Sequence, residues 1–255
     1  MTNPRASLLV LVCFVGIFQL ACARRNPGNA STSPSPDETE MANKILDRFV
    51  AELGGREAID GVKTYQGKGH FEMAAVNVRG DLEVWAKDPN KSLMVVQFPG
   101  IPPLRKGFDG ETYWVQTPIG TFSLKGPQEI SQIEHDAEVY GAWRIRNLYH
   151  RIRLDSRARL NGRDVYVIEG QPVKGPAEKL FFDVDNGLLL RWDMARRNPN
   201  RTVFVKVHLN DYRDVDGVKV PFNVRLAFES FDFTVTLDEM HHNVPMDDAI
   251  FRQPR

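Results

Sequence analysis

Cysteine is almost absent from this chain of 255 residues. The two that occur, Cys13 and Cys22, both lie close to the N-terminus. The rest of the sequence therefore offers no disulfide framework, no thiolate metal site and no cysteine nucleophile. A surplus of charge is absent too, because 33 lysines and arginines balance 33 aspartates and glutamates. No overall positive field draws the chain to nucleic acid, and we expect no nucleic-acid partner.

The sequence also lacks the signatures of the common catalytic sites. It contains no Gly-x-Ser-x-Gly elbow, no His-Glu-x-x-His pair and no glycine-rich phosphate loop. His241 and His242 are adjacent in the chain, and on a strand they would point to opposite faces and could not easily share one ion. We therefore expect no enzyme activity, no catalytic residue, no bound metal and no cofactor.

The first 23 residues have the pattern of an export signal. Arg5 precedes an uncharged run over residues 6–20, and small residues follow at 21–23. The run is shorter than the roughly 20 apolar residues of a membrane span, so cleavage fits better than an uncleaved anchor. Residues 24–39 are rich in proline, serine and asparagine and predict a flexible tether.

Two interpretations of the cleavage site stay open. Ala21-Cys22-Ala23 has the small-x-small form that suits ordinary signal peptidase. Leu20-Ala21-Cys22 instead resembles the end of a bacterial lipobox, although Gln19 departs from that motif. On the second interpretation Cys22 is lipidated and attaches the protein to a membrane, and the tether joins this anchor to the domain.

Residues 40–255 predict a single domain made mostly of strands. Between Val218 and Phe228 every second residue is apolar, which is typical of a strand with one buried face. A helix is expected over 40–53, where apolar residues recur at helical spacing before Gly54 and Gly55. Strands are expected over 64–73, 76–86, 92–98, 104–108, 112–116, 121–124, 152–160, 163–171, 177–183, 188–195, 201–212, 218–228 and 231–241.

A second helical segment is expected over 128–151, where Ile130, Ile133 and Ala137 fall near helical spacing. The strands around it are joined by short turns and form an antiparallel meander. A curved sheet of this length must close, cover its edges or wrap around an insert. We therefore predict a mainly β (α+β) fold, in which a curved antiparallel sheet forms an unclosed barrel that is covered by the inserted helices.

Several short motifs, each a turn between strand residues, follow one another in a characteristic order. They are GFDG at 107–110 with YW at 113–114, KLFFD at 179–183 with NGLLLR at 186–191, DYR at 211–213 with VDGV at 215–218 and PF at 221–222, and NVP at 243–245 with DDAIF at 247–251. Together they resemble the superfamily of periplasmic lipoprotein carriers and outer-membrane lipoprotein-sorting proteins, the LolA/LolB-like proteins. The resemblance covers residues 44–251.

This resemblance implies an apolar cavity between sheet and helices that binds acyl chains without covalent chemistry. The expected protein is exported, lies in the periplasm or is anchored to a membrane of a bacterial cell envelope, and binds lipid or acylated lipoprotein for transport or sorting. We expect it to be a monomer. The alternative is an envelope sensor or scaffold that uses the same fold to bind a protein partner.

Large aromatic side chains are the candidate lining of such a cavity, because they provide the non-directional apolar burial that a fatty chain needs. The same residues more often form only the core of a domain, so their sequence positions leave both roles open. The candidates are Phe98, Phe108, Trp114, Trp143, Tyr149, Phe222 and Phe233.

Overall fold

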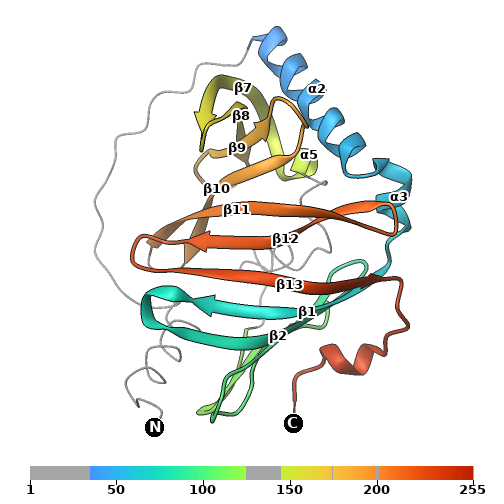
Figure 1. Ribbon diagram of the computed structural model, residues 1–255, viewed down its shortest axis with the longest axis vertical. Coiled ribbons are helices and arrows are strands. Elements are labelled where there is room, and N and C mark those ends of the chain that lie inside the picture. Colours follow the sequence, from blue (N-terminus) through green and yellow to red (C-terminus); the bar gives the residue numbers. More distant parts are fainter. Residues whose placement is uncertain (1–34, 125–144, 174, 199–200, 255) are drawn as a thin grey trace.

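The computed structural model describes residues 35–124, 145–173, 175–198 and 201–254. One antiparallel sheet of 13 strands dominates these residues (Figure 1). The strands are β1 (Thr64–Met73), β2 (Val78–Lys87), β3 (Lys91–Gln97), β4 (Leu104–Phe108), β5 (Tyr113–Thr117), β6 (Gly120–Leu124), β7 (Tyr149–Leu160), β8 (Arg163–Pro172), β9 (Glu178–Asp183), β10 (Leu189–Asn198), β11 (Arg201–Val215), β12 (Val218–Ala227) and β13 (Asp232–His242).

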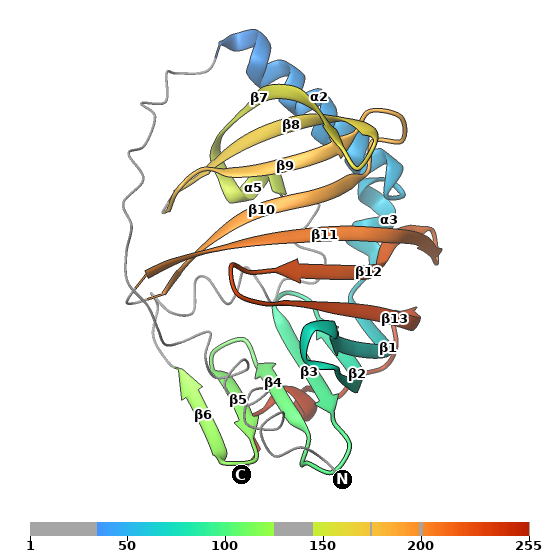
Figure 2. The same cartoon turned by 60° about the vertical axis from the view of Figure 1, so that its left-hand side comes forward.

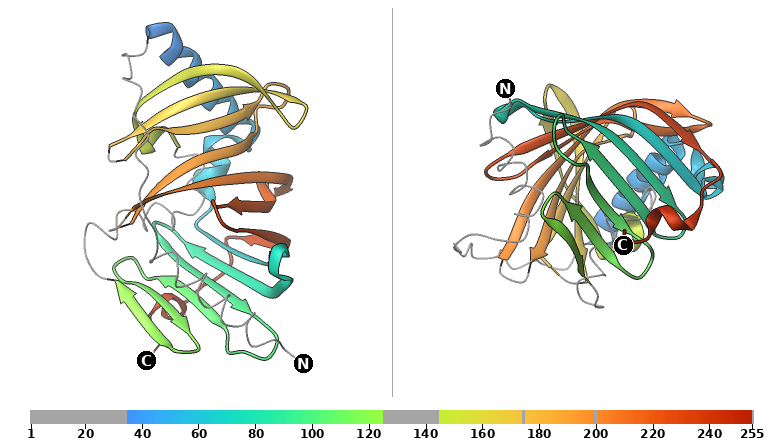
Figure 3. Two further views of the ribbon diagram at one scale, coloured as in Figure 1. Left: turned by 90° about the vertical axis from the view of Figure 1, so that its left-hand side faces the viewer. Right: turned by 90° about the horizontal axis from the view of Figure 1, so that it is seen from below.

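The sheet consists of two meanders joined through their outermost strands. Neighbouring strands follow one another from β1 to β6 and from β7 to β13, and β1 pairs with β13. The two edges are therefore β6 and β7, which do not pair with each other, so the sheet curves without closing (Figure 2 and Figure 3). The predicted fold class is confirmed, and each of the 13 predicted strands is present.

Two helices, α2 (Pro36–Glu52) and α3 (Gly55–Gly61), precede the sheet. The first begins four residues before the predicted start, because Ser35 and Glu38 form a capping box. The Ser35 hydroxyl accepts a hydrogen bond from the Glu38 N–H (3.2 Å), and the Glu38 carboxylate accepts one from the Ser35 N–H (2.9 Å). Residues 36–39, predicted as tether, are therefore helical.

The predicted second helix lies largely outside the described residues. Its described part is the short helix α5 (Ile145–Leu148), and β7 begins directly after it at Tyr149. Residues 149–151 were expected in a helix and belong to a strand instead. Two short 3-10 helices complete the described structure, η2 (Ala74–Val76) after β1 and η3 (Asp248–Phe251) near the C-terminus.

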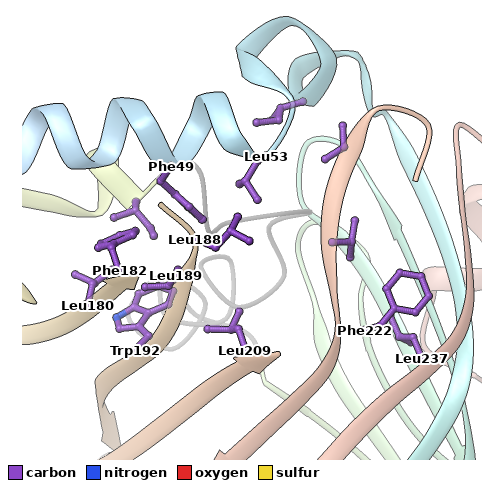
Figure 4. Packing of buried hydrophobic residues seen from close by; sticks show 14 of the residues in the cluster. Phe49, Leu53, Leu180, Phe182, Leu188, Leu189, Trp192, Leu209, Phe222 and Leu237 are labelled. Carbon is purple, nitrogen blue, oxygen red and sulfur yellow. The ribbon is translucent and has the colours of Figure 1, made fainter. Parts of the chain in front are cut away.

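The largest core cluster lies between α2 and the face of the sheet on which this helix packs, which we call the inner face. Ala42, Ile45, Leu46 and Phe49 are buried at helical spacing along α2. The ring of Phe49 meets Phe182 of β9 edge-on, with 5.3 Å between ring centres, and Figure 4 shows the two pointing toward each other. Burial of this apolar surface holds the helix on the sheet.

Hydrogen bonds fasten the helices to one end of the strands. The Lys219 N–H, at the start of β12, donates to the Leu53 carbonyl oxygen (2.8 Å). The Arg48 guanidinium donates to the carbonyl oxygens of Val184 and Asp185 (2.8 and 2.6 Å), in the turn between β9 and β10. We call this the helix end of the sheet. The opposite end carries the β1–β2 and β12–β13 connections (Figure 1), together with the β3–β4 connection, and is called the loop end.

The C-terminal segment packs on the opposite, outer face of the sheet. Phe251 is fully buried there with Leu93 and Trp114, and the Trp114 indole N–H donates to the Phe251 carbonyl oxygen (2.7 Å). Trp114 lies against Gly107 of β4, where a Cβ atom would come within 2.3 Å of its ring. Glycine at this position therefore lets the indole lie flat on the sheet.

An ion pair also fastens the C-terminal segment. The Lys87 ammonium lies 2.6 Å from the Asp248 carboxylate, and the Lys91 ammonium contacts the same group. Hydrogen bonds from Lys87 and then Lys91 lower the pKa of Asp248 to about 2. These contacts are partly exposed, so their contribution to stability is smaller than that of the buried Phe251.

Replacement of Gly107 by alanine should destabilise the protein, because the added methyl group would displace the Trp114 ring from the sheet. We expect a loss of about 1–3 kcal/mol in the free energy of unfolding, measured by urea denaturation. Gly61→Ala is the control, since no atom lies within 4 Å of the Cβ position there. A Gly107→Ala loss no larger than that of the control would contradict this packing.

A buried histidine makes stability depend on pH. Desolvation lowers the pKa of His242 below its ordinary value of 6.5, although Asp216, the Val215 backbone and Asp214 oppose the shift. Its Nδ1 atom lies 4.0 Å from the Asp216 carboxylate. Because the folded protein binds the proton more weakly than the unfolded chain does, acidification through pH 6.5 favours unfolding.

We therefore expect the urea midpoint to fall between pH 7.5 and pH 5 and the fall to be smaller in His242→Gln. His241→Gln is the matched control, because its side chain is 60 % exposed. Equal pH dependence in the wild type and His242→Gln would show that this imidazole does not contribute. His208, whose pKa is lowered by desolvation and by Arg191 and Arg225, adds an effect of the same sign in all three proteins.

Candidate functional site

Side chains fill the inner face where α2 covers it. A small cavity of about 20 Å³ lies beside Phe49, Val50 and Ile145, which is room for roughly one water molecule. Figure 4 shows Phe182, Leu188 and other buried side chains directly beneath the helix. An acyl chain needs far more space than this cavity offers, and the described side chains beneath α2 pack together as a core.

Away from α2, partly buried apolar side chains lie on the inner face among fully buried ones such as Leu82, Val96 and Leu104. We call this region the open half. Apolar surface that is left accessible on a folded domain marks interaction sites, and the partly buried side chains here extend over β2, β3, β11 and β13. The partly buried residues here include Val84, Met94, Val207, Phe233, Val235 and Met240.

Five phenylalanines gather at the loop end of the open half, and we call them the phenylalanine cluster. Phe71 of β1 contacts Phe98 edge-on at 5.9 Å and Phe233 at 5.0 Å between ring centres. Phe228 stacks on Phe231 at 4.5 Å and lies 6.0 Å from Phe233. Phe71 and Phe98 are buried, whereas the other three are partly exposed. The cluster thus runs from the core to the accessible surface.

Glycine in the neighbouring strand positions this cluster. Gly80 of β2 lies opposite Phe71 of β1, and a Cβ atom on it would come within 2.8 Å of the Phe98 ring. The missing side chain lets Phe98 lie across β2 and reach Phe71. Two predicted site residues, Phe98 and Phe233, are therefore brought together through a third phenylalanine.

Two other predicted residues belong to the core of the sheet. Trp114 is buried on the outer face beneath the C-terminal segment, on the opposite side from Tyr113 and Val115, because neighbouring residues in a strand alternate. Phe108 is fully buried in β4. Trp114 therefore does not face the open half, and Phe108 presents no surface to a ligand.

Tyr149 holds a buried carboxylate. Its hydroxyl donates to Oε2 of Glu178 (2.7 Å), and the Trp192 indole N–H donates to the same oxygen (2.9 Å). Glu178 is 5 % exposed, and a charge buried to this extent needs such donors. The Tyr149 ring lies against Gly170, where a Cβ atom would come within 2.7 Å of it. Tyr149 is thus part of the packing of the covered half.

The remaining predicted residues are placed as follows. Phe222 is buried in the core cluster, with the Arg213 guanidinium carbon 4.4 Å from its ring centre. Trp143 and Cys22 lie outside the described residues. Of the seven aromatic candidates, Phe233 is the one that is both described and partly exposed on the open half.

Sequence reasoning missed Phe71, Phe228 and Phe231, although all three lie in or next to predicted strands. The spacing of two residues between Phe231 and Phe233, and between Phe71 and Met73, indicates that each pair lies on one face of its strand. What this spacing did not show was the pairing of β1 with β13, which brings Phe71 opposite Val235.

Within the described ranges, no three histidines, cysteines, aspartates or glutamates are grouped so that they could hold a metal ion. In that same part of the chain, no helix has the length and apolar character needed to cross a membrane.

Solved structures of the same architecture are available for comparison. A DUF1329 family protein from Desulfovibrio piger aligns with a TM-score of 0.59 at 16 % identity, over 87 % of this chain and 98 % of that one. A LolA superfamily protein from Nitrosomonas europaea aligns with a TM-score of 0.55 at 14 % identity, over 83 % and 97 %. The chain has the LolA-like fold.

A third solved structure has a similar fold. A domain from Vibrio parahaemolyticus, described as outer membrane lipoprotein-sorting, aligns with a TM-score of 0.50 at 12 % identity, over 84 % of this chain and 97 % of that one. No family model matches the sequence, and no curated protein does. At such identities the likeness concerns the path of the chain, so a function must be argued from this protein's own residues.

Tyr149→Phe should destabilise the protein, because Glu178 loses a hydrogen-bond donor while it stays buried. We expect a loss of about 1–3 kcal/mol in the free energy of unfolding, measured by urea denaturation. Tyr166→Phe is the control, since its hydroxyl contacts Arg157 at an exposed position. Similar small losses in the two variants would contradict a structural role for the Tyr149 hydroxyl.

Proposed function

We propose that this protein is exported to the bacterial cell envelope and binds a lipid, or the acyl chains of a lipoprotein, on the open half of the inner face. The observation that carries the proposal is the accessible apolar surface of this half, which ends in the phenylalanine cluster. The LolA-like fold supports it, because related structures include a LolA superfamily protein and a lipoprotein-sorting domain.

Acyl burial on this surface provides enough free energy for binding. Each methylene group removed from water contributes about 0.8 kcal/mol, so ten methylenes contribute about 8 kcal/mol. Association and ordering of the ligand cost at least 4 kcal/mol in return. A chain of this length can therefore bind reversibly, as transport or sorting requires, and no covalent step is needed.

The N-terminal sequence supports the envelope location. Residues 1–23 have the composition of an export signal, and the segment that follows has the composition of a tether. With lipidation at Cys22 the domain would be held at a membrane and act as a local acceptor. Without it the protein would move freely through the periplasm as a carrier.

Native mass spectrometry with ligand extraction tests the proposal. The full chain with Cys22→Ser, which cannot carry an acyl group at that position, is expressed in a bacterium and purified without detergent. We expect a co-purifying lipid or acylated peptide. Phe233→Asp should lose it, because a carboxylate would stand on the surface that contacts the acyl chain.

Phe204→Asp is the matched control, since Phe204 is 56 % exposed and alternates with the buried Val205 in β11. This variant should keep the ligand, and circular dichroism should show both variants folded. A wild-type protein that is empty and takes up no added palmitate would contradict lipid binding. It would favour an envelope sensor or scaffold that binds a protein partner.

A further inference from the structure

The two edges of the sheet differ in charge. The edge strand β7 contains four arginines and one aspartate, and Arg157 and Arg159 are exposed. Charged side chains on an edge strand oppose its pairing with another chain. The other edge strand, β6, has the sequence Gly-Thr-Phe-Ser-Leu and contains no charged residue. It pairs with β5 on one side, and no strand of the described residues pairs with it on the other (Figure 2).

Large apolar side chains at β6 are accessible. Phe122, in the middle of the strand, is 50 % exposed, and Ile119, in the turn that precedes it, is 65 % exposed. Phe122 lies opposite Val115 of β5, the neighbour of Trp114 on the outer face. Alternation therefore places Phe122 on the inner face. Accessible apolar surface beside an unpaired strand edge is typical of a contact with another chain.

The turn before β6 shows which backbone groups point away from β5. Two residues join the strands, with Thr117 and Gly120 as the flanking pair. In such a hairpin the flanking residues are a hydrogen-bonded pair, and every second pair along the two strands is hydrogen-bonded as well. Phe122 therefore bonds to β5, whereas the N–H and C=O groups of Thr121 and Ser123 point outward.

The β4–β5 hairpin leads to the same assignment. The Asp109 N–H donates to the Thr112 carbonyl oxygen (3.3 Å), so every second residue of β5 counted from Thr112 bonds to β4, Trp114 included. The next residue, Val115, then directs its backbone groups to β6, where it lies opposite Phe122. Both hairpins thus leave the backbone groups of the residues on either side of Phe122 on the free edge.

Two copies of β6 can satisfy these groups for each other. In an antiparallel pair with Phe122 opposite its symmetry mate, Thr121 of one copy lies opposite Ser123 of the other, and each such pair exchanges two hydrogen bonds. The two phenylalanines form the central pair, where cross-strand side chains lie closest. This arrangement has twofold symmetry, so it closes at two copies. Pairing of β6 with β7 of a second copy would instead bury arginines against a strand that offers them no carboxylate.

We propose that two copies of this protein pair through β6 in this antiparallel register. The sheet of one copy then continues into that of the other, and the two inner faces meet at Phe122. This inference does not depend on lipid binding, and it differs from the monomer that the sequence predicted. Five residues on each side form a small interface, so the association is weak and the dimer forms reversibly as the concentration rises.

Sedimentation velocity measures the association. The protein is the full chain with Cys13→Ala and Cys22→Ser, which leaves no cysteine and no acyl attachment at residue 22. We expect the weight-average mass to rise from that of a monomer toward that of a dimer between about 5 and about 500 µM, the range of a weak interface.

Charge at the twofold axis should prevent the association. Phe122→Asp should stay monomeric over the same range, because pairing would bring two carboxylates together. Phe204→Asp is the matched control, since Phe204 is 56 % exposed in β11, which pairs with strands on both sides. This variant should associate as the wild type does.

Single cysteines added to the cysteine-free chain identify the register. Phe122→Cys places two thiols at the axis on residues whose Cα atoms are about 4.5 Å apart, within the range of a disulfide, so oxidation should give a covalent dimer. Ser123→Cys is the control, because its two thiols lie on a diagonal of about 7–8 Å and should give little covalent dimer. Urea denaturation under reducing conditions shows that each variant is folded.

Each outcome decides for or against the pairing. A dimer that is lost in Phe122→Asp and cross-linked at residue 122 but not at 123 establishes it. A wild-type protein that stays monomeric, with no covalent dimer of Phe122→Cys, overturns it. A dimer that survives Phe122→Asp and is not cross-linked at residue 122 also overturns it, because another surface then makes the contact. Species larger than a dimer would show a contact that does not close and would contradict the symmetric pair.

Discussion

The pairing of β1 with β13 is the contact on which the rest of the structure depends. It runs from Tyr65 opposite His242 to Glu72 opposite Thr234, with a bulge at Lys68 and Gly69. Without it the chain would form two separate meanders, each with two exposed edges that invite aggregation. The bulge requires glycine, because a Cβ atom on Gly69 would lie 1.9 Å from the Thr236 carbonyl oxygen. Through this seam the inner face becomes continuous from β10 to β4.

The inner face is continuous, but its two halves differ. The helix α2 covers one half, where Phe49 meets Phe182 and where Tyr149 and Trp192 hold the carboxylate of Glu178. The helix α2 does not cover the other half, where some apolar side chains, Phe233 among them, stay partly accessible. One sheet thus provides a rigid, close-packed support and a binding surface beside it. Rigid support of this kind keeps the accessible surface in shape when it is empty.

Three aromatic rings of this sheet lie against glycines, and all three side chains are buried. Trp114 covers Gly107, Tyr149 covers Gly170 and Phe98 covers Gly80. In each case the ring fills the space that a side chain on the next strand would take, so it becomes part of the core. Phe233 makes no such contact with a glycine of the described residues and stays partly exposed in the phenylalanine cluster.

The sequence alone determined the number and the order of the strands, because alternation of apolar residues is a local property of an extended chain. It also contained the capping pair Ser35 and Glu38, which sets the start of α2 and was overlooked. The tertiary structure decided which face of each strand is covered. Alternation separates Trp114 from its neighbours Tyr113 and Val115 but does not say which side meets the helices or the C-terminal segment. The accessibility of Phe233 and its contact with Phe71 depend on the β1–β13 pairing, which joins segments that lie far apart in the chain.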